Sequence, residues 1–141
     1  MKIFWPIMSL FTAVGIFFSS SIHGYASGNA SMGIAEWVRN VIPIDPDLMN
    51  FLVRKGAHFT VYFILGFCVA HSLKYYVKNK KSLFTYAWGI AALYGVFDEF
   101  HQYFIPGRVC SVWDMLINAA GAMAGVAVAF LIIAFFSTRH K

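Results

Sequence analysis

Four long apolar segments dominate the pattern of the chain. They span residues 3–22, 51–73, 83–104 and 115–136, and each is close to the roughly 20 residues that an α-helix needs to cross about 30 Å of hydrocarbon. They do not show the short apolar and polar alternation of membrane β-barrel strands. Because backbone groups in lipid must be satisfied within the segment, the pattern predicts an all-α bundle of four transmembrane helices.

A fifth, shorter segment between the first two apolar stretches has helical periodicity. It runs from Ala30 to Ile42, reads ASMGIAEWVRNVI, and carries these apolar side chains on one face: Ile34, Trp37, Val38 and Val41. The pattern predicts a short amphipathic helix on the membrane surface, with Trp37 at headgroup depth. Pro43 and Pro46 are expected to end this helix before the chain enters the membrane again.

Composition supports a membrane protein with a single domain. Of the 141 residues, 60% are hydrophobic, 18% are aromatic and only 12% are charged, and the mean hydropathy is +0.66. Soluble domains usually carry about 25% charged residues. The chain therefore falls outside the soluble globular class.

The charged residues predict the orientation of the helices. Seven cations stand at the chain ends and in the connection between the second and third apolar segments: Lys2, Lys74, Lys78, Lys80, Lys81, Arg139 and Lys141. All six acids lie on the other side with only four cations, so the two sides carry about +7 and −2, in agreement with the net charge of +5. Loops rich in lysine and arginine stay in the cytoplasm, so both termini are expected there and the amphipathic helix outside. The isoelectric point near 9.4 then reflects topology and requires no nucleic-acid partner.

The first apolar segment has an alternative interpretation as a secretory signal peptide. Lys2, the apolar run 3–18 and the small residues Gly24 and Ala26 are compatible with cleavage after Ala26. The run is somewhat long for such a signal, and residues 19–21 extend it without a sharp break, so a retained helix is preferred. Cleavage would not change the orientation of the other three helices.

The few charges of the chain gather beside its apolar segments. Residues 97–121, FDEFHQYFIPGRVCSVWDMLINAAG, contain Asp98, Glu99, His101, Arg108 and Asp114. The uncharged stretch 83–97 would be about 22 Å long as a helix, which places Asp98 at or just below the outer interface. The outer ends of the neighbouring apolar segments fall at the same level, so polar groups of three helices are expected to converge there.

Helical spacing indicates which polar side chains share a face. Three groups result: Lys55 with His58 and Tyr62, Asp98 with His101 and Gln102, and Asp114 with Asn118. Pro106 and Gly107 predict a tight turn that brings Arg108 back over these groups. Ser111 is expected to cap the last helix, as an alternative to a chemical role. Ionisable groups at membrane depth are costly unless paired or solvated, so the cluster predicts a functional site.

A purely structural role is the alternative for these charges. Carboxylates and cations of the cluster could form ion pairs that only fasten helix ends, although this explains the whole set less well. Glu99 lies one residue off the Asp98 face and Arg54 stands beside Lys55, so Glu99 and Arg54 are expected to be solvated surface charges.

The remaining motifs have structural interpretations. Gly121 and Gly125 form a GxxxG pattern, which predicts close packing within the chain rather than dimerisation. Cys68 and Cys110 are expected to lie too far apart for a disulfide. Three histidines lack polar neighbours and are expected at the interface or in solvent: His23, His71 and His140.

Two stretches, RKGAHFTVYFILG and DEFHQYFIPGRVCSVWDMLINAAG, resemble the VanZ-like family of small bacterial membrane proteins. The family is named for a glycopeptide-resistance protein that lowers susceptibility to teicoplanin. The positions that match the family pattern are Lys55, His58, Tyr62, Asp98, Glu99, His101, Gln102, Pro106, Gly107, Arg108, Ser111, Asp114, Asn118 and Gly121. Val61 departs from it, because the family often has glutamate there. The resemblance implies a cell-envelope protein of the bacterial cytoplasmic membrane more directly than it implies a reaction.

The first hypothesis for the cluster is an active site for an envelope lipid or a lipid-linked cell-wall precursor. Lys55 and Arg108 would bind a phosphate or carboxylate, which arginine can contact at two points. The catalytic candidates, in which an imidazole acts as acid or base beside a carboxylate, are His58, Asp98, His101 and Asp114. The other candidates for substrate binding are Tyr62, Gln102, Ser111 and Asn118.

Other interpretations remain open at this stage. The histidines and carboxylates could instead hold a divalent metal, although no HExxH motif is present. In the second hypothesis the same groups bind a headgroup, an antibiotic or a partner protein without chemistry, and resistance follows from masking or remodelling the surface. A transporter is a weaker third interpretation, because four short helices leave little room for alternating access.

Overall fold

A computed structural model describes residues 2–22, 24–39 and 45–138, most of which are helical. These ranges contain five α-helices and no strand, which confirms the all-α class. The helices are α1 (Phe4–Ser20), α2 (Gly24–Arg39), α3 (Pro46–Leu73), α4 (Lys80–Gln102) and α5 (Val112–Thr138).

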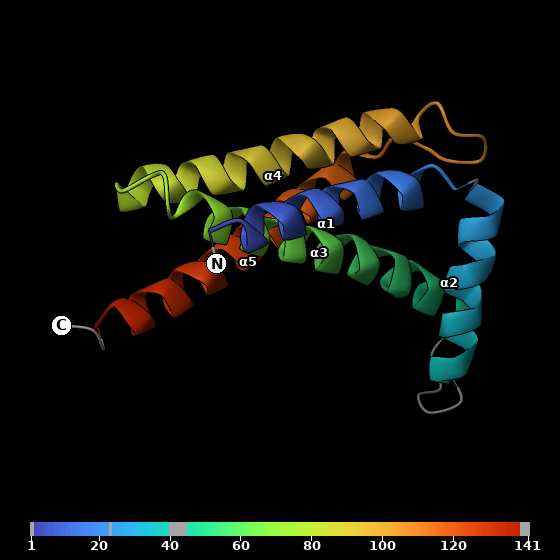
Figure 1. Cartoon of the computed structure of the whole chain (residues 1–141). Helices are drawn as coiled ribbons and strands as arrows, with labels where there is room; N and C mark the ends of the chain where they lie inside the picture. Colours follow the sequence, from blue (N-terminus) through green and yellow to red (C-terminus); the bar gives the residue numbers. More distant parts are fainter. Residues whose placement is uncertain (1, 23, 40–44, 139–141) are drawn as a thin grey trace.

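Four of the helices lie alongside one another, and α2 crosses their end (Figure 1). The four helices alternate in direction, so the start of α1, the α3–α4 turn and the end of α5 lie at one end of the bundle. The α4–α5 loop and α2 lie at the opposite end. The most extensive packing joins α3 to α5, and α1 contacts both α3 and α4.

Two of the helices are long and apolar enough to span a membrane. They are Pro46–Leu73, with 28 residues and a mean hydropathy of 1.4, and Val112–Phe136, with 25 residues and a mean hydropathy of 2.4. α1 is apolar but has only 17 residues, and α4 is not among the candidate spans found in the described residues. The four-span bundle therefore remains a prediction.

The start of α3 differs from the predicted boundary at residue 51 for a local reason. Asp45 caps the helix by accepting hydrogen bonds from the backbone N–H groups of Asp47 at 3.1 Å and Leu48 at 3.0 Å. Pro46 occupies the first turn, where its missing N–H leaves no bond unmade. Pro46, which the sequence marks as a break, is thus also the residue that starts α3.

The amphipathic helix α2 begins earlier than its hydrophobic pattern predicts, at Gly24. Residues 40–42 of the predicted helix lie outside the described part of the chain. The hydroxyl of Ser31 donates to Asn50 Oδ1 at 2.6 Å and so ties α2 to α3. Trp37 is 72% exposed on the apolar side of α2, as expected for a helix that lies on a membrane surface.

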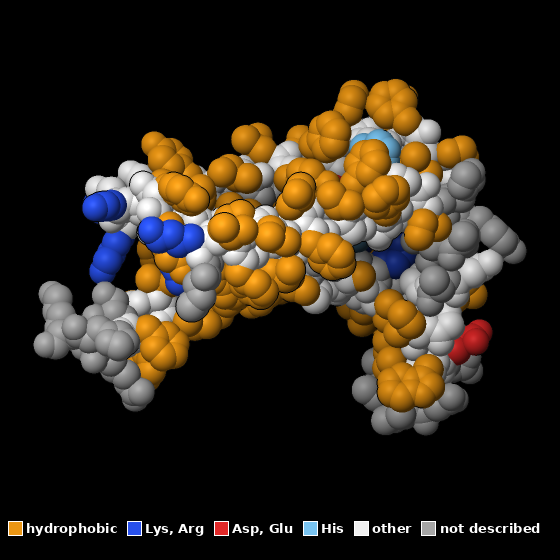
Figure 2. All heavy atoms as spheres, in the orientation of Figure 1, with side chains coloured by type: hydrophobic (Ala, Val, Ile, Leu, Met, Phe, Trp, Pro, Cys, Tyr) orange, Lys and Arg blue, Asp and Glu red, His pale blue; other side chains and the backbone are white. Residues whose placement is uncertain are grey.

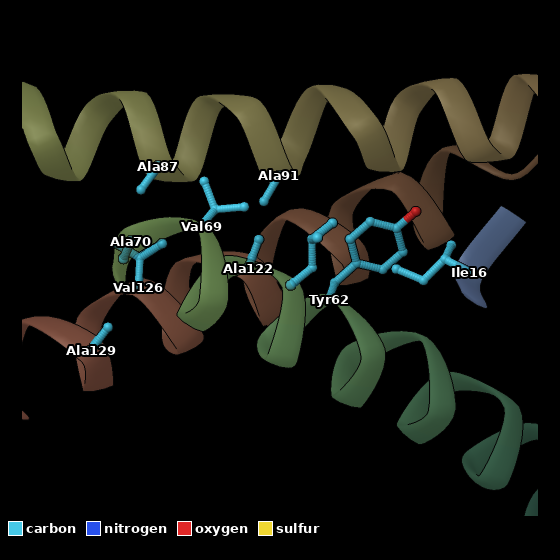
Figure 3. Close-up of a cluster of buried hydrophobic side chains, with 10 residues drawn as sticks. Ile16, Tyr62, Val69, Ala70, Ala87, Ala91, Ala122, Val126 and Ala129 are labelled. Carbon is cyan, nitrogen blue, oxygen red and sulfur yellow. The ribbon is translucent and has the colours of Figure 1, made fainter. Parts of the chain in front are cut away.

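Small side chains let the helices approach closely in the core (Figure 3). The buried cluster comes from α1, α3, α4 and α5 and comprises Ile16, Tyr62, Leu65, Val69, Ala70, Ala87, Ala91, Ala122, Val126 and Ala129. Tyr62 is fully buried, and its ring extends toward Ile16 (Figure 3). The buried cluster therefore extends from the alanines of α4 and α5 to Tyr62 and Ile16.

Gly121 and Gly125 allow α5 to lie directly against the backbone of α3. A methyl group on either glycine would overlap the carbonyl group of Phe59 or Phe63. The predicted GxxxG packing within the chain is confirmed. Because Phe59 directly follows His58, this contact also fixes the position of that imidazole relative to α5.

Charged and apolar side chains occupy different parts of the surface (Figure 2). Apolar side chains cover the middle of the bundle, and lysine or arginine side chains gather at the end where α1 starts. The α3–α4 turn at that end carries Lys74 and Lys78. Toward the opposite end of the bundle, a Lys or Arg side chain is visible deep in a hollow between the bundle and α2 (Figure 2).

Candidate functional site

An open pocket of about 610 Å³ lies between α1, α2, α3 and α4. Its apolar lining includes Phe11, Ile16, Ile34, Val53, Val61 and Ile64. Its polar lining comes mainly from the helix ends next to α2 and includes Ser19, Ser20, Ser31, Arg54, His58, Asp98, Gln102 and Arg108. The pocket therefore offers an apolar wall along the bundle and a basic, polar wall at the end of the bundle.

Arg108 reaches the pocket from the α4–α5 loop. Gly107 has a φ of 75°, which a glycine adopts without strain, and this turn directs the following arginine back toward α1. The guanidinium donates to Ser19 O at 3.2 Å, Ile22 O at 3.3 Å and Gln102 Oε1 at 3.2 Å. Two of these acceptors are backbone carbonyls at the end of α1, where a cation is favoured.

The charge state of Arg108 follows from its surroundings. Burial and the neighbouring Arg54 cation lower the pKa of the Arg108 guanidinium. An arginine side chain is not deprotonated in proteins, so the group still carries its charge at neutral pH. Arg54 itself is exposed and lines the same pocket. The expectation that Arg54 is a solvated surface charge is therefore confirmed. Its side chain is also part of the pocket lining, which the sequence does not predict.

Asp98 is linked to Arg108 through Gln102. The amide nitrogen of Gln102 donates to Asp98 Oδ2 at 3.0 Å and to Ser20 Oγ at 3.2 Å, while its oxygen accepts from Arg108. Asp98 and Gln102 are each only 3% exposed. The chain of bonds therefore joins α1, α4 and the α4–α5 loop under the polar wall of the pocket.

Glu99 is fully buried, so the prediction that it is a solvated surface charge is wrong. The physical reason is that α4 packs against α1 and α3 on one side and α5 on another, which leaves no solvated face one residue beyond Asp98. Glu99 Oε2 accepts the backbone N–H of Ser111 at 3.1 Å. Glu99 Oε1 lies 3.8 Å from His58 Nδ1 and has no hydrogen-bond partner among the described residues.

Lys55 and Asp114 form a direct ion pair between α3 and α5. The hydroxyl of Ser111 accepts the backbone N–H of Asp114 at 3.3 Å, so the predicted capping role of Ser111 is confirmed. The structural alternative of an ion pair thus applies to Lys55 and Asp114. It does not join Arg108 to Asp114, because Arg108 turns toward α1.

His58 stands between the pocket and this buried cluster. It lines the pocket, and its Nδ1 lies 3.1 Å from Asn118 Oδ1. Asn118 is fully buried, and its amide nitrogen has no hydrogen-bond partner in the described structure. The geometry therefore separates the predicted residues into a pocket group around Arg108 and a buried group around Glu99, with His58 touching both.

His101 lies away from these contacts, whereas Tyr62 lies beside Asp98. His101 stacks on Phe17 of α1 with ring centroids 4.5 Å apart, and it is not among the residues that line the pocket. Tyr62 lines the pocket from the core, and its buried hydroxyl has no hydrogen-bond partner in the described structure. Val61, where the family often has glutamate, is part of the apolar wall.

At the opposite end of the bundle, the expectation that His71 lies at the interface or in solvent is wrong. His71 is buried at 3% exposure instead of lying at the interface or in solvent. Its ring lies between Trp5 and Phe67, with centroid distances of 4.4 Å to both, and its Nδ1 lies 3.1 Å from Phe67 O. His23 and His140 fall outside the described residues. Cys68 and Cys110 are both free thiols, as expected.

The motif residues thus fall on the turns of α3 and α4 at the bundle end next to α2, on the α4–α5 loop and on the first turns of α5. No curated protein and no solved structure matches the chain. A family model described as VanZ/LLP1 matches residues 5–134, which is nearly the whole chain. Together with two helices of membrane-spanning length and composition, this match indicates a membrane protein. The chain belongs to the VanZ/LLP1 family.

Proposed function

We propose that the chain is a multi-pass protein of the bacterial cytoplasmic membrane, with four spans and both termini in the cytoplasm. The lysines of the α3–α4 turn support this orientation, because basic connections are retained inside. α1 is the shortest span, at about 25 Å for a helix of its length. In this orientation α2 lies on the extracytoplasmic surface, and the pocket opens at that level.

The pocket is proposed to bind an anionic envelope lipid or a lipid-linked cell-wall precursor. One observation carries this function: two arginines, Arg54 and Arg108, stand at the polar wall of a pocket whose other wall is apolar. An acyl or prenyl chain suits the wall formed by Phe11, Val61 and Ile64. A phosphate or carboxylate headgroup suits the arginines, because a guanidinium binds such an anion through short, charge-assisted hydrogen bonds.

Both arginines retain donors for such a headgroup. A guanidinium has five N–H donors, and the three contacts of Arg108 to the protein leave the others free to bind a ligand. Arg54 is exposed and can turn toward a bound anion. Arg108 would supply a fixed contact, and Arg54 a contact that forms when the lipid enters.

A second candidate function is acid–base chemistry on the bound headgroup. The observation that favours it is the position of His58, which lines the pocket while its Nδ1 lies 3.1 Å from Asn118 Oδ1 and 3.8 Å from Glu99 Oε1. An imidazole held by an amide and backed by a carboxylate suits a general acid or base. Among the two histidines of the motif, this role belongs to His58, because His101 stacks on Phe17.

Protection from a glycopeptide such as teicoplanin belongs to the same proposal. Masking or altering an anionic lipid at the outer face would change the surface that the antibiotic meets. Such an effect requires only that the pocket bind its lipid, with or without chemistry.

Lipid and cell-wall precursor profiles separate binding from catalysis. Cells that express wild type, His58→Gln or Asp98→Asn are compared by mass spectrometry, with the exposed Lys78→Gln as a control at the far end of the bundle. A change in composition that requires His58 and Asp98 supports an enzyme. An unchanged composition, with an anionic lipid enriched on the purified protein, supports binding alone. The absence of both effects contradicts the proposal.

A further inference from the structure

Three helices each bring one potential metal ligand to a common point. The residues are His58 from α3, Glu99 from α4 and Asp114 from α5, and one ligand atom of each lies within 4.8 Å of the others. Side chains that meet in this way from separate helices are the usual source of metal sites in bundle cores. The cluster is distinct from the arginines of the pocket.

Glu99 provides the independent sign that a cation belongs there. Its side chain is fully buried, and Oε1 has no hydrogen-bond partner in the described structure, although it lies 3.8 Å from His58 Nδ1. The backbone N–H of Ser111 holds Oε2 at 3.1 Å and so directs Oε1 toward the imidazole. A buried carboxylate oxygen without a donor is costly, and a metal ion would satisfy it.

The lysine next to the cluster is engaged elsewhere, because Lys55 is paired with Asp114 Oδ1. The nearest cationic partner of Glu99 is the ring of His58, which carries a charge only when it is protonated and lies 3.8 Å away, beyond hydrogen-bond distance. Asp114 has a second carboxylate oxygen, so it can contact an ion while it keeps Lys55.

We propose that His58, Glu99 and Asp114 bind one divalent transition metal ion, of which Zn²⁺ is the best match. Zn²⁺ takes imidazole nitrogen and carboxylate oxygen at about 2.0–2.2 Å in a tetrahedral arrangement, so the ligand atoms of such a site are about 3.4 Å apart. Small rotations of the three side chains bring their atoms from within 4.8 Å to that spacing. A mixed nitrogen and oxygen set also favours such an ion over Mg²⁺ or Ca²⁺, which prefer oxygen alone.

The neighbours of the cluster suit a metal site. Ser111 orients Glu99. Asn118 Oδ1 lies 3.1 Å from His58 Nδ1 and orients the ring when Nδ1 carries the proton, which leaves Nε2 as the nitrogen that binds the ion. Such supporting contacts typically fix the ligands of a bound metal. Since His58 also lines the pocket, the ion would lie at the pocket wall, with room for a ligand from that side.

Metal binding by the purified full-length protein tests the inference directly. The protein is stripped with a chelator, incubated with Zn²⁺, desalted and measured by elemental mass spectrometry, and its affinity is determined by competition with a chromophoric chelator. Wild type is expected to retain one Zn²⁺ per chain. Glu99→Gln and His58→Gln are each expected to weaken binding by at least about tenfold, whereas Glu36→Gln, on the exposed side of α2, is expected to bind like wild type.

The result separates this inference from the proposed lipid function. Arg54→Gln removes a headgroup cation and should leave the zinc affinity unchanged. Circular dichroism shows whether each variant keeps its helices, so a loss of metal in a folded protein is meaningful. Wild type that retains only traces of zinc, or ligand variants that bind like wild type, would overturn the metal site whatever the lipid measurements show.

Discussion

Asp98 and Glu99 are adjacent in the chain, yet their carboxylates face different partners. Asp98 accepts from Gln102 and lines the pocket, whereas Glu99 points to Ser111 and His58. A helix turns about 100° per residue, so the two side chains can serve two neighbouring compartments only because other helices cover both faces of α4. Single residues thus acquire their roles from what packs beside them.

At the residue scale, Arg108→Lys is expected to abolish most of any envelope phenotype, such as protection from teicoplanin. Arg108 contacts two helix-end carbonyls and Gln102 at once, and a lysine ammonium cannot reproduce this planar set and still grip a headgroup. The variant is expected to be expressed and inserted like wild type. Susceptibility testing and quantitative immunoblotting of membrane fractions measure both outcomes.

The matched control for Arg108→Lys is Lys78→Arg, which makes the reverse exchange in the α3–α4 turn. That variant should protect like wild type. If Arg108→Lys also protects like wild type, or if its defect only follows a lower protein level, Arg108 serves to fasten the loop and not to bind a headgroup.

Helical spacing predicts much of the candidate site. The residues that it misses depend on contacts between helices. The i, i+3 and i+7 positions correctly place Lys55, His58 and Tyr62 on the inner side of one helix. The same argument failed for Glu99, because a helical wheel cannot show that α5 covers the adjacent face. It also could not show that His101 stacks on Phe17. Among the sequence signals, only the match to the family pattern marks Glu99.

At the scale of elements, the α3–α5 contact holds the two groups of polar side chains in register. Gly125→Ala is expected to destabilise the protein by about 1–3 kcal/mol, because the added methyl group would overlap the Phe63 carbonyl. Gly89→Ala in α4 is the matched control, since a methyl group there meets nothing within 4 Å. That variant is expected to be neutral or up to about 1 kcal/mol more stable.

Thermal unfolding in detergent distinguishes the two glycines. A clear fall in Tm for Gly125→Ala, with no fall for Gly89→Ala, supports close helix packing at the GxxxG pattern. Equal Tm values for the two variants would show that α3 and α5 do not approach as closely as the structure has them.

The helices themselves follow from the apolar runs, while their ends follow from local capping. Hydropathy locates α1, α3, α4 and α5 to within a few residues, because apolar length is what a span requires. It misses the first turns of α3, where Asp45 and Pro46 initiate the helix in polar sequence. It also misses the start of α2, since residues such as Gly24 and Ser27 give no periodic signal.

At the scale of the whole molecule, the proposed orientation makes a prediction about the native thiols. Cys110 is half-buried in the α4–α5 loop and Cys68 is buried in α3. A membrane-impermeant maleimide should therefore label Cys110 in intact cells. Lys78→Cys, placed in a Cys110→Ser background, should react only after permeabilisation. The reverse pattern would place the pocket on the cytoplasmic side.

The central claim is that the pocket binds an anionic lipid, and native mass spectrometry of the purified protein measures this most directly. Wild type, Arg54→Gln and Lys78→Gln are incubated with phosphatidylglycerol or phosphatidylethanolamine of identical acyl chains. Wild type and Lys78→Gln are expected to retain phosphatidylglycerol preferentially. Arg54→Gln is expected to lose about tenfold in affinity for it, the effect of one charge-assisted contact. Equal retention of the two lipids by wild type, or unchanged phosphatidylglycerol binding by Arg54→Gln, would contradict the account.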